Sequence, residues 1–453
     1  MLASTFSRWL AGRGIHYGWV VAAVAFLAML SSSAALGLPG VLLRPLGESY
    51  GWNTEQISSA LAVRFLLFGL MAPFSAIFMA RYGLRNVMCV ALTLVASGLI
   101  LATGMTALWQ LFMLWGVMLG IGSGLTALVL AAVVANRWFD ARRGLVIGML
   151  TASSATGQLI FLPIGAWLVE HYGWRMAIAP VFAFCLVVAL LAALFVRSHP
   201  ADVGLRPYGA KPDAEHSATS DAKPDAPAAV TPTVSAPAAT LPLGRALLTP
   251  FTQIYSVRKS STFWVLFGTF FICGLSTNGL IQTHFISLCS DFGLSAIPAA
   301  SVLAMMGAFD FVGTILSGWL SDRYDNRKLL FWYYGLRGLS LFWLPHSEFS
   351  IYGLSLFAMF YGLDWIATVP PTVKLAGQAF GRDRAPLIFG WIFAGHQLGA
   401  ATAAYGAGTV RTLLLTYSPA LYAAGTACLI AAVAVFIIRR PAATSAELTA
   451  QRA

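Results

Sequence analysis

Charged residues are scarce in this chain. Asp, Glu, Lys and Arg together make up 10% of its 453 residues, whereas soluble domains carry about a quarter. Hydrophobic residues account for 58% of the sequence, and the mean hydropathy is +0.76. This balance argues against a soluble globular domain and predicts a protein that spans a membrane.

Cysteines are few and scattered, with no Cys-x-x-Cys pair and no metal-ligand spacing. We therefore expect neither a disulfide framework nor a metal site. The sequence also has no Walker loop and no nucleophile–base arrangement, which argues against an enzyme or an ATP-driven pump and leaves no cofactor to be expected. The five cysteines are Cys89, Cys185, Cys273, Cys289 and Cys428.

Basic residues exceed acidic ones by 11, but their placement argues against nucleic-acid binding. They lie between apolar runs, as in multispan proteins, whose inner loops are rich in Lys and Arg. With both termini cytoplasmic, 23 of the 28 Lys and Arg residues lie at the inner side. We therefore expect a monomer in a bacterial inner membrane, in this orientation. The exceptions are Arg44, Arg175 and Arg411 in outer loops and Arg64 and Arg337 within helices.

Twelve apolar runs are long enough for helices that cross a bilayer, each of which needs about 20 residues. The predicted fold class is an all-α membrane protein, with twelve transmembrane helices in two pseudo-symmetric six-helix bundles. The runs cover residues 17–43, 55–80, 87–105, 108–135, 144–168, 174–196, 262–287, 297–320, 329–345, 350–374, 385–409 and 417–438.

A polar segment over residues 209–242 separates the sixth and seventh runs. It is rich in Ala, Pro, Ser, Thr and Asp and cannot bury a core, so we expect a disordered cytoplasmic linker. Residues 244–260 then have the pattern of a short amphipathic helix on the membrane surface. The expected domains are an N-terminal half (1–197), a mostly disordered linker (198–260), a C-terminal half (261–440) and a cytoplasmic tail (441–453).

The two halves are related in sequence. Residues 80–85 after span two read ARYGLR, and residues 322–327 after span eight read DRYDNR. After span four, Gly148 and Gly157 lie nine residues apart; after span ten, two further glycines, at 390 and 399, have the same spacing. Matches at two corresponding places indicate a duplicated six-helix unit.

These motifs carry a resemblance to a known family. The stretch GWLSDRYDNR, its counterpart ARYGLR and the six-plus-six arrangement resemble the major facilitator superfamily, over essentially the whole chain. HYGWVV, YGWNTEQIS, NRWFDARRGLVIG and HPADVGLRPYG resemble its monocarboxylate-porter-like branch. The resemblance implies secondary active transport of a small organic solute by two halves that rock about a central site.

The resemblance also implies a gate at the inner face, where the Gly-x-x-x-Asp-Arg loop of this family helps to hold the outward-facing state. Gly318, Asp322 and Arg323 keep the pattern, while the first half keeps Arg81 without the acid. We expect Gly318 to let a helix approach closely. Asp322 would bind a helix N-terminus or a cation, and Arg323 would fix that pair. An ordinary charged loop is the alternative.

Four ionisable residues of the second half are expected at one depth near mid-membrane: Asp310, Arg337, Asp364 and His396. At 1.5 Å per helical residue, they lie about 13–18 Å from the charged inner edge. Charges there are costly and must face each other or a wet cavity. Arg337 would neutralise Asp310 or Asp364, and the remaining acid is a proton-carrier candidate. His396 could titrate, or could simply form a hydrogen bond between helices.

The usual carboxylate anchors of the monocarboxylate branch are missing. Asp310 falls where these porters carry an acid, but Thr314 stands in place of their arginine and Gly37 in place of their span-one lysine. Arg64 in span two is the remaining cation of the first half. It either binds a substrate carboxylate through two hydrogen bonds or extends outward as a structural residue.

Three polar side chains are further candidates for binding a substrate. Asn278 and Gln282 lie four apart on one face of span seven, and Gln158 lies in span five. Hydrogen bonding between helices is the alternative for each. The aromatic residues around Asp364 either stack on a ring-bearing substrate or pack in the core; they are Phe360, Tyr361 and Trp365.

The first functional prediction is proton-coupled uptake of a monocarboxylate-like organic anion. Uptake of an aromatic or vitamin-like solute such as riboflavin is the second. Drug/proton antiport is the third, although the Gly-Pro pair of antiporters in span five is replaced by Gly157-Gln158. A non-transporting receptor on the same scaffold is a further alternative. The expected partners are a small-molecule substrate, protons and the lipid bilayer, without nucleic acid.

Overall fold

The computed structural model describes residues 2–210, 242–381 and 384–438. Residues 211–241 of the expected linker and the whole of the expected C-terminal tail lie outside these residues. The described chain is helical and contains no strand, apart from a single bridge between Phe139 and Tyr208.

The first half contains the six expected membrane-spanning regions, several of which are built from two or more consecutive helices. Its helices are α1 (Leu2–Ala11), α2 (Gly18–Gly37), α3 (Pro39–Tyr50), α4 (Thr54–Tyr82), α5 (Leu84–Ala102), α6 (Leu108–Leu111), η1 (Phe112–Leu119), α7 (Gly120–Leu125), α8 (Leu128–Trp138), α9 (Arg143–Tyr172), α10 (Trp174–Phe195) and η2 (Pro200–Val203).

The second half repeats this plan after one additional helix, α12. Its helices are α12 (Leu243–Val257), α13 (Ser261–Gly274), η3 (Leu275–Gln282), α14 (Thr283–Asp291), α15 (Ala296–Arg323), α16 (Asn326–Trp343), η4 (Leu344–His346), α17 (Ile351–Asp364), α18 (Val369–Phe380), α19 (Ala385–Leu414), α20 (Ser418–Ala434) and η5 (Val435–Ile437).

Ten helical stretches of the described chain are long and apolar enough to cross a membrane. Two further helices complete the twelve: α9, with 30 residues, and α16, with 18 residues. α16 is less apolar because it carries Arg327, Lys328 and Arg337. The predicted fold class, twelve transmembrane helices in two six-helix bundles, is confirmed.

The first span is longer than its apolar run suggested. Residues Gly18–Tyr50 form one nearly continuous helical stretch, with the junction at Leu38, directly before Pro39 and Gly40. Beyond the expected end at residue 43, the side chains of Arg44 and Glu48 form an ion pair one turn apart, which supports the additional turns. The apolar pattern missed this polar extension.

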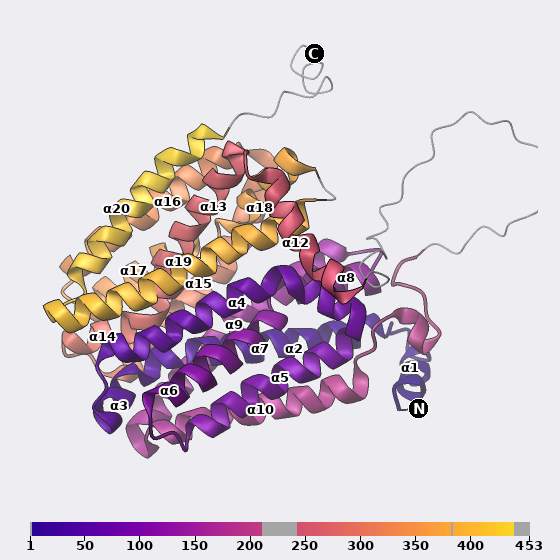
Figure 1. Ribbon diagram of the computed structural model, residues 1–453, viewed down its shortest axis with the longest axis horizontal. Helices are drawn as coiled ribbons and strands as arrows, with labels where there is room; N and C mark the ends of the chain where they lie inside the picture. Colours follow the sequence, from indigo (N-terminus) through magenta and orange to yellow (C-terminus); the bar gives the residue numbers. More distant parts are fainter. Residues whose placement is uncertain (1, 211–241, 382–383, 439–453) are drawn as a thin grey trace, which may run out of the picture.

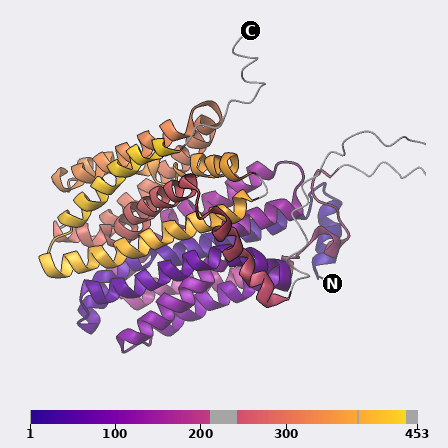
Figure 2. The same cartoon turned by 45° about the horizontal axis from the view of Figure 1, so that its top comes forward.

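The two halves meet along a seam of three helix pairs. α4 packs on α19, α9 packs on α15, and α3 packs on α14. Figure 1 shows α4 and α19 next to each other, with the first half in indigo to magenta on one side and the second half in salmon to yellow on the other. The end where residues 210 and 242 leave the bundle is called the linker end below, and the opposite end the distal end; Figure 2 shows both.

Three glycines at a spacing of four allow close contact within the first half. A Cβ atom on Gly120 would lie 2.9 Å from the backbone oxygen of Arg64, and one on Gly124 would lie 2.6 Å from the Cβ of Met71. Gly116 faces the same helix, α4. Small residues are therefore required here, because the backbones of η1, α7 and α4 approach too closely for larger side chains.

Candidate functional site

Span ten, Ile351–Phe380, is interrupted midway along its length, beside Asp310. α17 ends at Asp364 and α18 begins at Val369, so the backbone between them leaves the regular helical hydrogen-bond pattern. The sequence reason is the Pro370-Pro371 pair at the start of α18. Neither proline has an N–H to donate, so carbonyls one turn earlier are left without their helical partners.

Side chains of α15 compensate for this interruption. Asp310 is 3% exposed, and its Oδ1 accepts the backbone N–H of Ile366 at 2.9 Å and the hydroxyl of Thr314 at 3.0 Å. Two turns further along α15, the hydroxyl of Ser317 donates to the backbone oxygen of Ala367 at 2.5 Å. The buried carboxylate thus holds an otherwise unpaired amide of the neighbouring span.

Arg337 binds Asp364 and not Asp310. Its Nε donates to Asp364 Oδ2 at 2.7 Å, and Nη2 donates to the backbone oxygens of Asp364, at 2.5 Å, and Trp365, at 3.2 Å. The side chain of Arg337 is fully buried. A guanidinium at this place binds one oxygen of the carboxylate and the last carbonyls of α17, where the helix dipole favours a cation. The other oxygen, Asp364 Oδ1, is buried without a partner among the described residues. Of the two possible pairs in the sequence, the structure contains Arg337–Asp364.

Cys273 of α13 connects span seven to this cluster. Arg337 Nη1 donates to its Sγ at 3.0 Å, and the thiol lies 3.3 Å from the hydroxyl of Thr368. Nearby, the hydroxyl of Tyr361 donates to the backbone oxygen of Ser276 at 2.8 Å. Sequence reasoning did not select Cys273 or Thr368. The proline pair was the available signal, because it predicts exposed carbonyls that require donors.

His396 lies at the edge of the same cluster. Its ring packs beside the rings of Phe270 and Phe393, with centroids 4.9 and 5.9 Å away, and its Nδ1 is buried without a partner among the described residues. The backbone of α19 at this residue also faces Gly274 at close range. Arg337 and Asp364 are thus in direct contact, Asp310 binds the amide two residues after Asp364, and His396 faces α13, the helix that carries Cys273.

Arg64 is the buried cation of the first half. It lies on α4 with 1% of its surface exposed, and its guanidinium carbon is 4.7 Å from the centroid of the Phe65 ring. Its Nε and Nη1 are buried without a hydrogen-bond partner among the described residues. The side chain does not extend to the surface, as a purely structural, outward-reaching arginine would. A buried guanidinium with unused donors is costly unless an anion occupies the site for part of the time.

The polar residues of span seven occupy a π-helical stretch, η3. Asn278 is half-buried, and its Oδ1 accepts the hydroxyl of Thr277 at 3.2 Å. Gln282 is 3% exposed, and its Oε1 has no partner among the described residues. Gln158 belongs to α9, but its side chain lies outside the described residues.

One buried glutamine was not predicted from the sequence. Gln397 of α19 is 1% exposed, and its Oε1 lacks a partner within the described part of the chain. Its side chain faces Gly69 of α4, five residues from Arg64. Sequence reasoning selected Gln158, Gln282 and His396 but passed over the residue that follows His396.

Asp322 at the linker end pairs with a lysine of the same half. Lys374 Nζ of α18 donates to Asp322 Oδ1 at 2.9 Å and to the backbone oxygen of Ser321 at 2.7 Å. The expected partner was a helix N-terminus or a cation, and the cation alternative is the one observed. Asp310 and Asp322 on α15 therefore both hold span ten, at its interruption and at its end.

The other residues expected in this gate lie differently from the prediction. Arg323 stacks over the Trp319 ring at 4.1 Å and donates to its backbone oxygen at 3.3 Å, so it does not fix the Asp322 pair. A Cβ atom on Gly318 would meet nothing within 4 Å, so the expected close helix approach is absent here. The exposed face of α15 at this level explains both observations. Arg81 lies in the last turn of α4 in the other half.

Hydrogen bonds join the two halves at the distal end. Glu55 Oε1 of α4 accepts the hydroxyls of Tyr405 at 2.9 Å and Thr409 at 3.1 Å, both from α19. Between α9 and α15, Glu170 Oε1 accepts the backbone N–H of Ile297 at 3.3 Å. Two carboxylates thus hold the second half against the first at this end.

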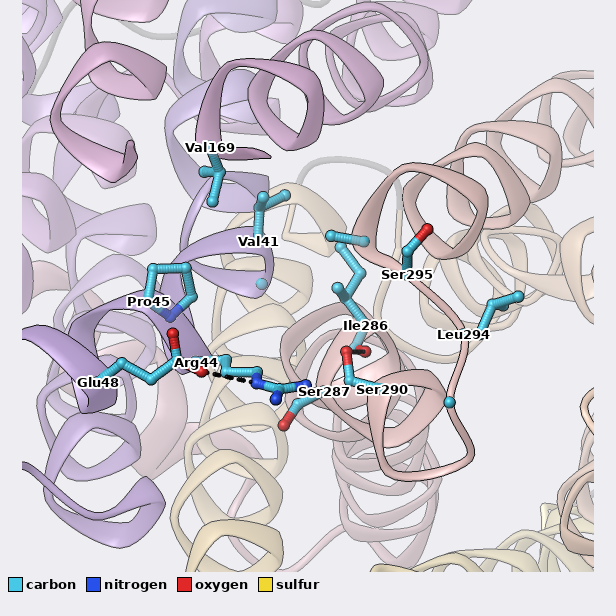
Figure 3. A pocket seen from close by; sticks show the side chains of 13 residues that line it. Val41, Arg44, Pro45, Glu48, Val169, Ile286, Ser287, Ser290, Leu294 and Ser295 are labelled. Carbon is cyan, nitrogen blue, oxygen red and sulfur yellow. Dashed lines mark hydrogen bonds and ion pairs between the residues drawn. The ribbon is translucent and has the colours of Figure 1, made fainter. Parts of the chain in front are cut away.

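A cavity of about 520 Å³ lies beside these contacts, between α3, α14 and the start of α15. Figure 3 shows Arg44 and its ion-pair partner Glu48 on one wall, with Ser287 and Ser290 on the other. The cavity is at the distal end and does not contain Asp310 or Arg64. It is therefore distinct from the central charges.

Comparison with known proteins gives the family. The model of the Major Facilitator Superfamily matches residues 21–404 and 290–453. An uncharacterised MFS-type transporter of Bacillus subtilis (strain 168) is 22% identical over 411 residues, covering 86% of this chain and 87% of that protein. Monocarboxylate transporter 13 of Bos taurus is 25% identical over 412 residues, covering 90% and 86%.

Solved structures support the same fold. The D-xylose–proton symporter superimposes with a TM-score of 0.68 at 13% identity, over 94% of this chain and 98% of that one. These relatives are membrane transporters and not enzymes. The two six-helix bundles and the family match lead to one conclusion: the chain belongs to the major facilitator superfamily and is a multi-pass membrane transporter of a small solute.

Proposed function

We propose that this protein moves a small organic anion together with protons across the bacterial inner membrane by alternating access, with both termini cytoplasmic. The linker end is then the cytoplasmic end. The observation that carries the proposal is the buried guanidinium of Arg64, whose Nε and Nη1 have no partner among the described residues. A substrate carboxylate would supply the missing acceptors through charge-assisted hydrogen bonds.

Asp310 is the proposed proton carrier in the other half. Arg337 is already bound to Asp364, and within the described chain Asp310 forms hydrogen bonds but no ion pair. Protonation would remove the charge that the Ile366 amide and the Thr314 hydroxyl stabilise. The Asp310 bonds at the interruption of span ten would weaken, so loading a proton would alter how α15 holds span ten.

Asp364 and Arg337 have a structural part in this proposal. Their ion pair and the two carbonyl contacts of Arg337 keep the end of α17 in place beside span seven. The pair would thereby position the interruption of span ten, where Asp310 accepts the backbone N–H of Ile366. His396, Asn278, Gln282 and Gln158 remain candidates for contacts with the substrate.

Relatives support an organic anion as the substrate class. The matched proteins include monocarboxylate transporters 13, 12 and 9, at 23–31% identity over different shares of the chain. No observation favours riboflavin-like uptake or drug antiport in particular. Tyr361 and Trp365 are buried and pack against each other with centroids 5.6 Å apart, whereas Phe360 is exposed on the other face.

Transport by purified protein tests the proposal. Proteoliposomes would be given labelled lactate, pyruvate, aromatic acids and riboflavin, with and without an inward proton gradient, for wild type and Asp310→Asn. Gradient-driven uptake of an acid that the variant loses supports both the substrate class and the carrier. Uptake of riboflavin alone would identify an aromatic or vitamin-like solute as the substrate and would contradict an organic anion. Uptake that neither the gradient nor Asp310→Asn changes would refute proton coupling through Asp310.

A further inference from the structure

Helix α12 lies across the seam at the linker end, where it contacts both halves. It packs on α4 of the first half and on α19 of the second. The Phe251 ring lies 5.7 Å from Phe74 and 5.7 Å from Trp391, and Trp391 Nε1 donates to the backbone oxygen of Pro250 at 2.9 Å. Figures 1 and 2 both show this helix crossing the ends of the bundle.

One face of α12 is buried against the bundle, and the opposite face is mostly exposed. Ala246, Pro250 and Val257 are buried against the bundle. On the opposite face, Leu248, Phe251 and Tyr255 are 58%, 50% and 64% exposed. Their spacing places them on one side of an α-helix, so three large apolar side chains form a stripe that is at least half exposed. Phe251 touches the bundle at the edge of this stripe, and the Arg258 guanidinium lies over the Tyr255 ring.

Cations border this stripe at both of its ends. Arg245 lies before it, and Arg258 and Lys259 lie after it; all three are exposed. No Asp or Glu occurs anywhere between Asp225 and Asp291, so no acid of this segment neutralises them. An apolar stripe with flanking cations and no acids fits the boundary between acyl chains and anionic headgroups.

The position of α12 next to a membrane-spanning helix would allow it to contact this lipid boundary. α12 leads within four residues into α13, which starts the seventh span at Ser261. Its Lys259 and Arg258 are therefore close to the level where a membrane-spanning helix emerges from the bilayer. A soluble partner would have to reach an apolar stripe at that level, where lipid is already present.

We propose that α12 is a lipid-binding strap: its stripe of Leu248, Phe251 and Tyr255 inserts into the leaflet at the linker end, while Arg245, Arg258 and Lys259 bind anionic phospholipid headgroups. Because Phe251 also touches Phe74 of α4 and Trp391 of α19, lipid bound here influences how the two halves meet at this end. The proposal is independent of the substrate and of proton coupling.

Lipid retention tests the charged part of the strap. Wild type and R245Q/R258Q/K259Q would be placed in nanodiscs of mixed phosphatidylcholine and phosphatidylglycerol, released, and analysed by native mass spectrometry. We expect wild type to retain phosphatidylglycerol preferentially, and each removed cation to lower that preference about five-fold. R85Q is the matched control, since Arg85 is an exposed cation at the linker end outside α12. Equal retention by the triple variant and wild type would overturn the proposal.

Labelling tests the apolar part without relying on the charge variants. L248C and A201C would be treated with a water-soluble maleimide in the same nanodiscs, with Ala201 as an exposed position in the η2 turn. We expect Cys at 248 to be labelled at least several-fold more slowly than Cys at 201. Equal labelling would show that the stripe faces water, which would contradict insertion and favour a soluble partner instead.

Discussion

The backbone N–H of Ile366 donates to Asp310 Oδ1 at 2.9 Å, which ties span eight to span ten where span ten is interrupted. On the same two spans, Lys374 Nζ donates to Asp322 Oδ1 at 2.9 Å. Two acids twelve residues apart on one helix thus hold the same neighbour at two heights. Substitutions at Asp310 and at Asp322 would therefore both act on span ten.

Asp310→Asn should separate proton coupling from folding. The asparagine oxygen still accepts the Ile366 N–H, so the interruption of span ten keeps its partner, but the side chain can no longer carry a proton. We expect gradient-driven accumulation to be lost while exchange of substrate across the membrane continues. Thr314→Val removes a neighbouring donor and leaves the carboxylate, so it is the control. Accumulation by Asp310→Asn in response to a gradient would exclude Asp310 as the carrier.

Arg337 and Asp364 should behave as a stability pair. Removing one partner leaves a buried charge, at a cost of about 3–5 kcal/mol, whereas removing both is far less damaging. We expect Arg337→Met and Asp364→Leu each to lower the thermal unfolding temperature of the purified protein. The double variant should be more stable than Asp364→Leu, which retains an unpaired guanidinium. Additive losses in the double variant would mean that the ion pair is not the source of the effect.

Arg64 should govern affinity for an anionic substrate. Loss of charge-assisted hydrogen bonds to a carboxylate corresponds to roughly 10- to 100-fold weaker binding. We expect Arg64→Gln to raise the KM for the transported acid by that factor, and Arg64→Lys to raise it less, because charge is retained but the planar donor pair is lost. Unchanged KM in Arg64→Gln would assign Arg64 to helix packing.

Asp322 should affect the rate of cycling more than stability. Its ion pair with Lys374 is exposed, and such pairs contribute little to the folded state. We expect Asp322→Asn and Lys374→Gln to change the maximal transport rate in the same direction, with similar KM and unfolding temperature. Arg323→Gln is the control, because Arg323 contacts Trp319 and not the pair. Different effects of the two substitutions would separate Asp322 from Lys374.

Glu55 should hold the distal end closed. Its Oε1 accepts two hydroxyls of the other half, and glutamine preserves an acceptor there whereas alanine does not. We expect Glu55→Ala to increase labelling of a cysteine placed at Val41, in the distal cavity, by a membrane-impermeant maleimide. Glu55→Gln should change it less. Labelling unaffected by both substitutions would show that this contact does not limit access.

Much of the fold could be predicted because membrane insertion imposes simple requirements. Twelve apolar runs, basic residues between them and two matching glycine spacings were sufficient for the two-bundle architecture. Residues 329–345 were recognisable as a span despite Arg337, because that charge is isolated in an apolar surrounding, and the observed helix covers Asn326–Trp343. The extension of the first span to Tyr50 was missed, since its last turns are polar and their helical state depends on side-chain pairs such as Arg44–Glu48.

The sequence by itself determined which charges are buried, since an ion inside an apolar run of this length has no route to bulk water. It also predicts a common depth for four of them, because helical rise is constant. Tertiary structure alone decided their partners. The sequence allowed Arg337 to pair with either Asp310 or Asp364, and only the packing of α16 against α17 selects Asp364. The same holds for Cys273, Gln397 and the Ile366 amide, which become part of the site only because distant helices converge there.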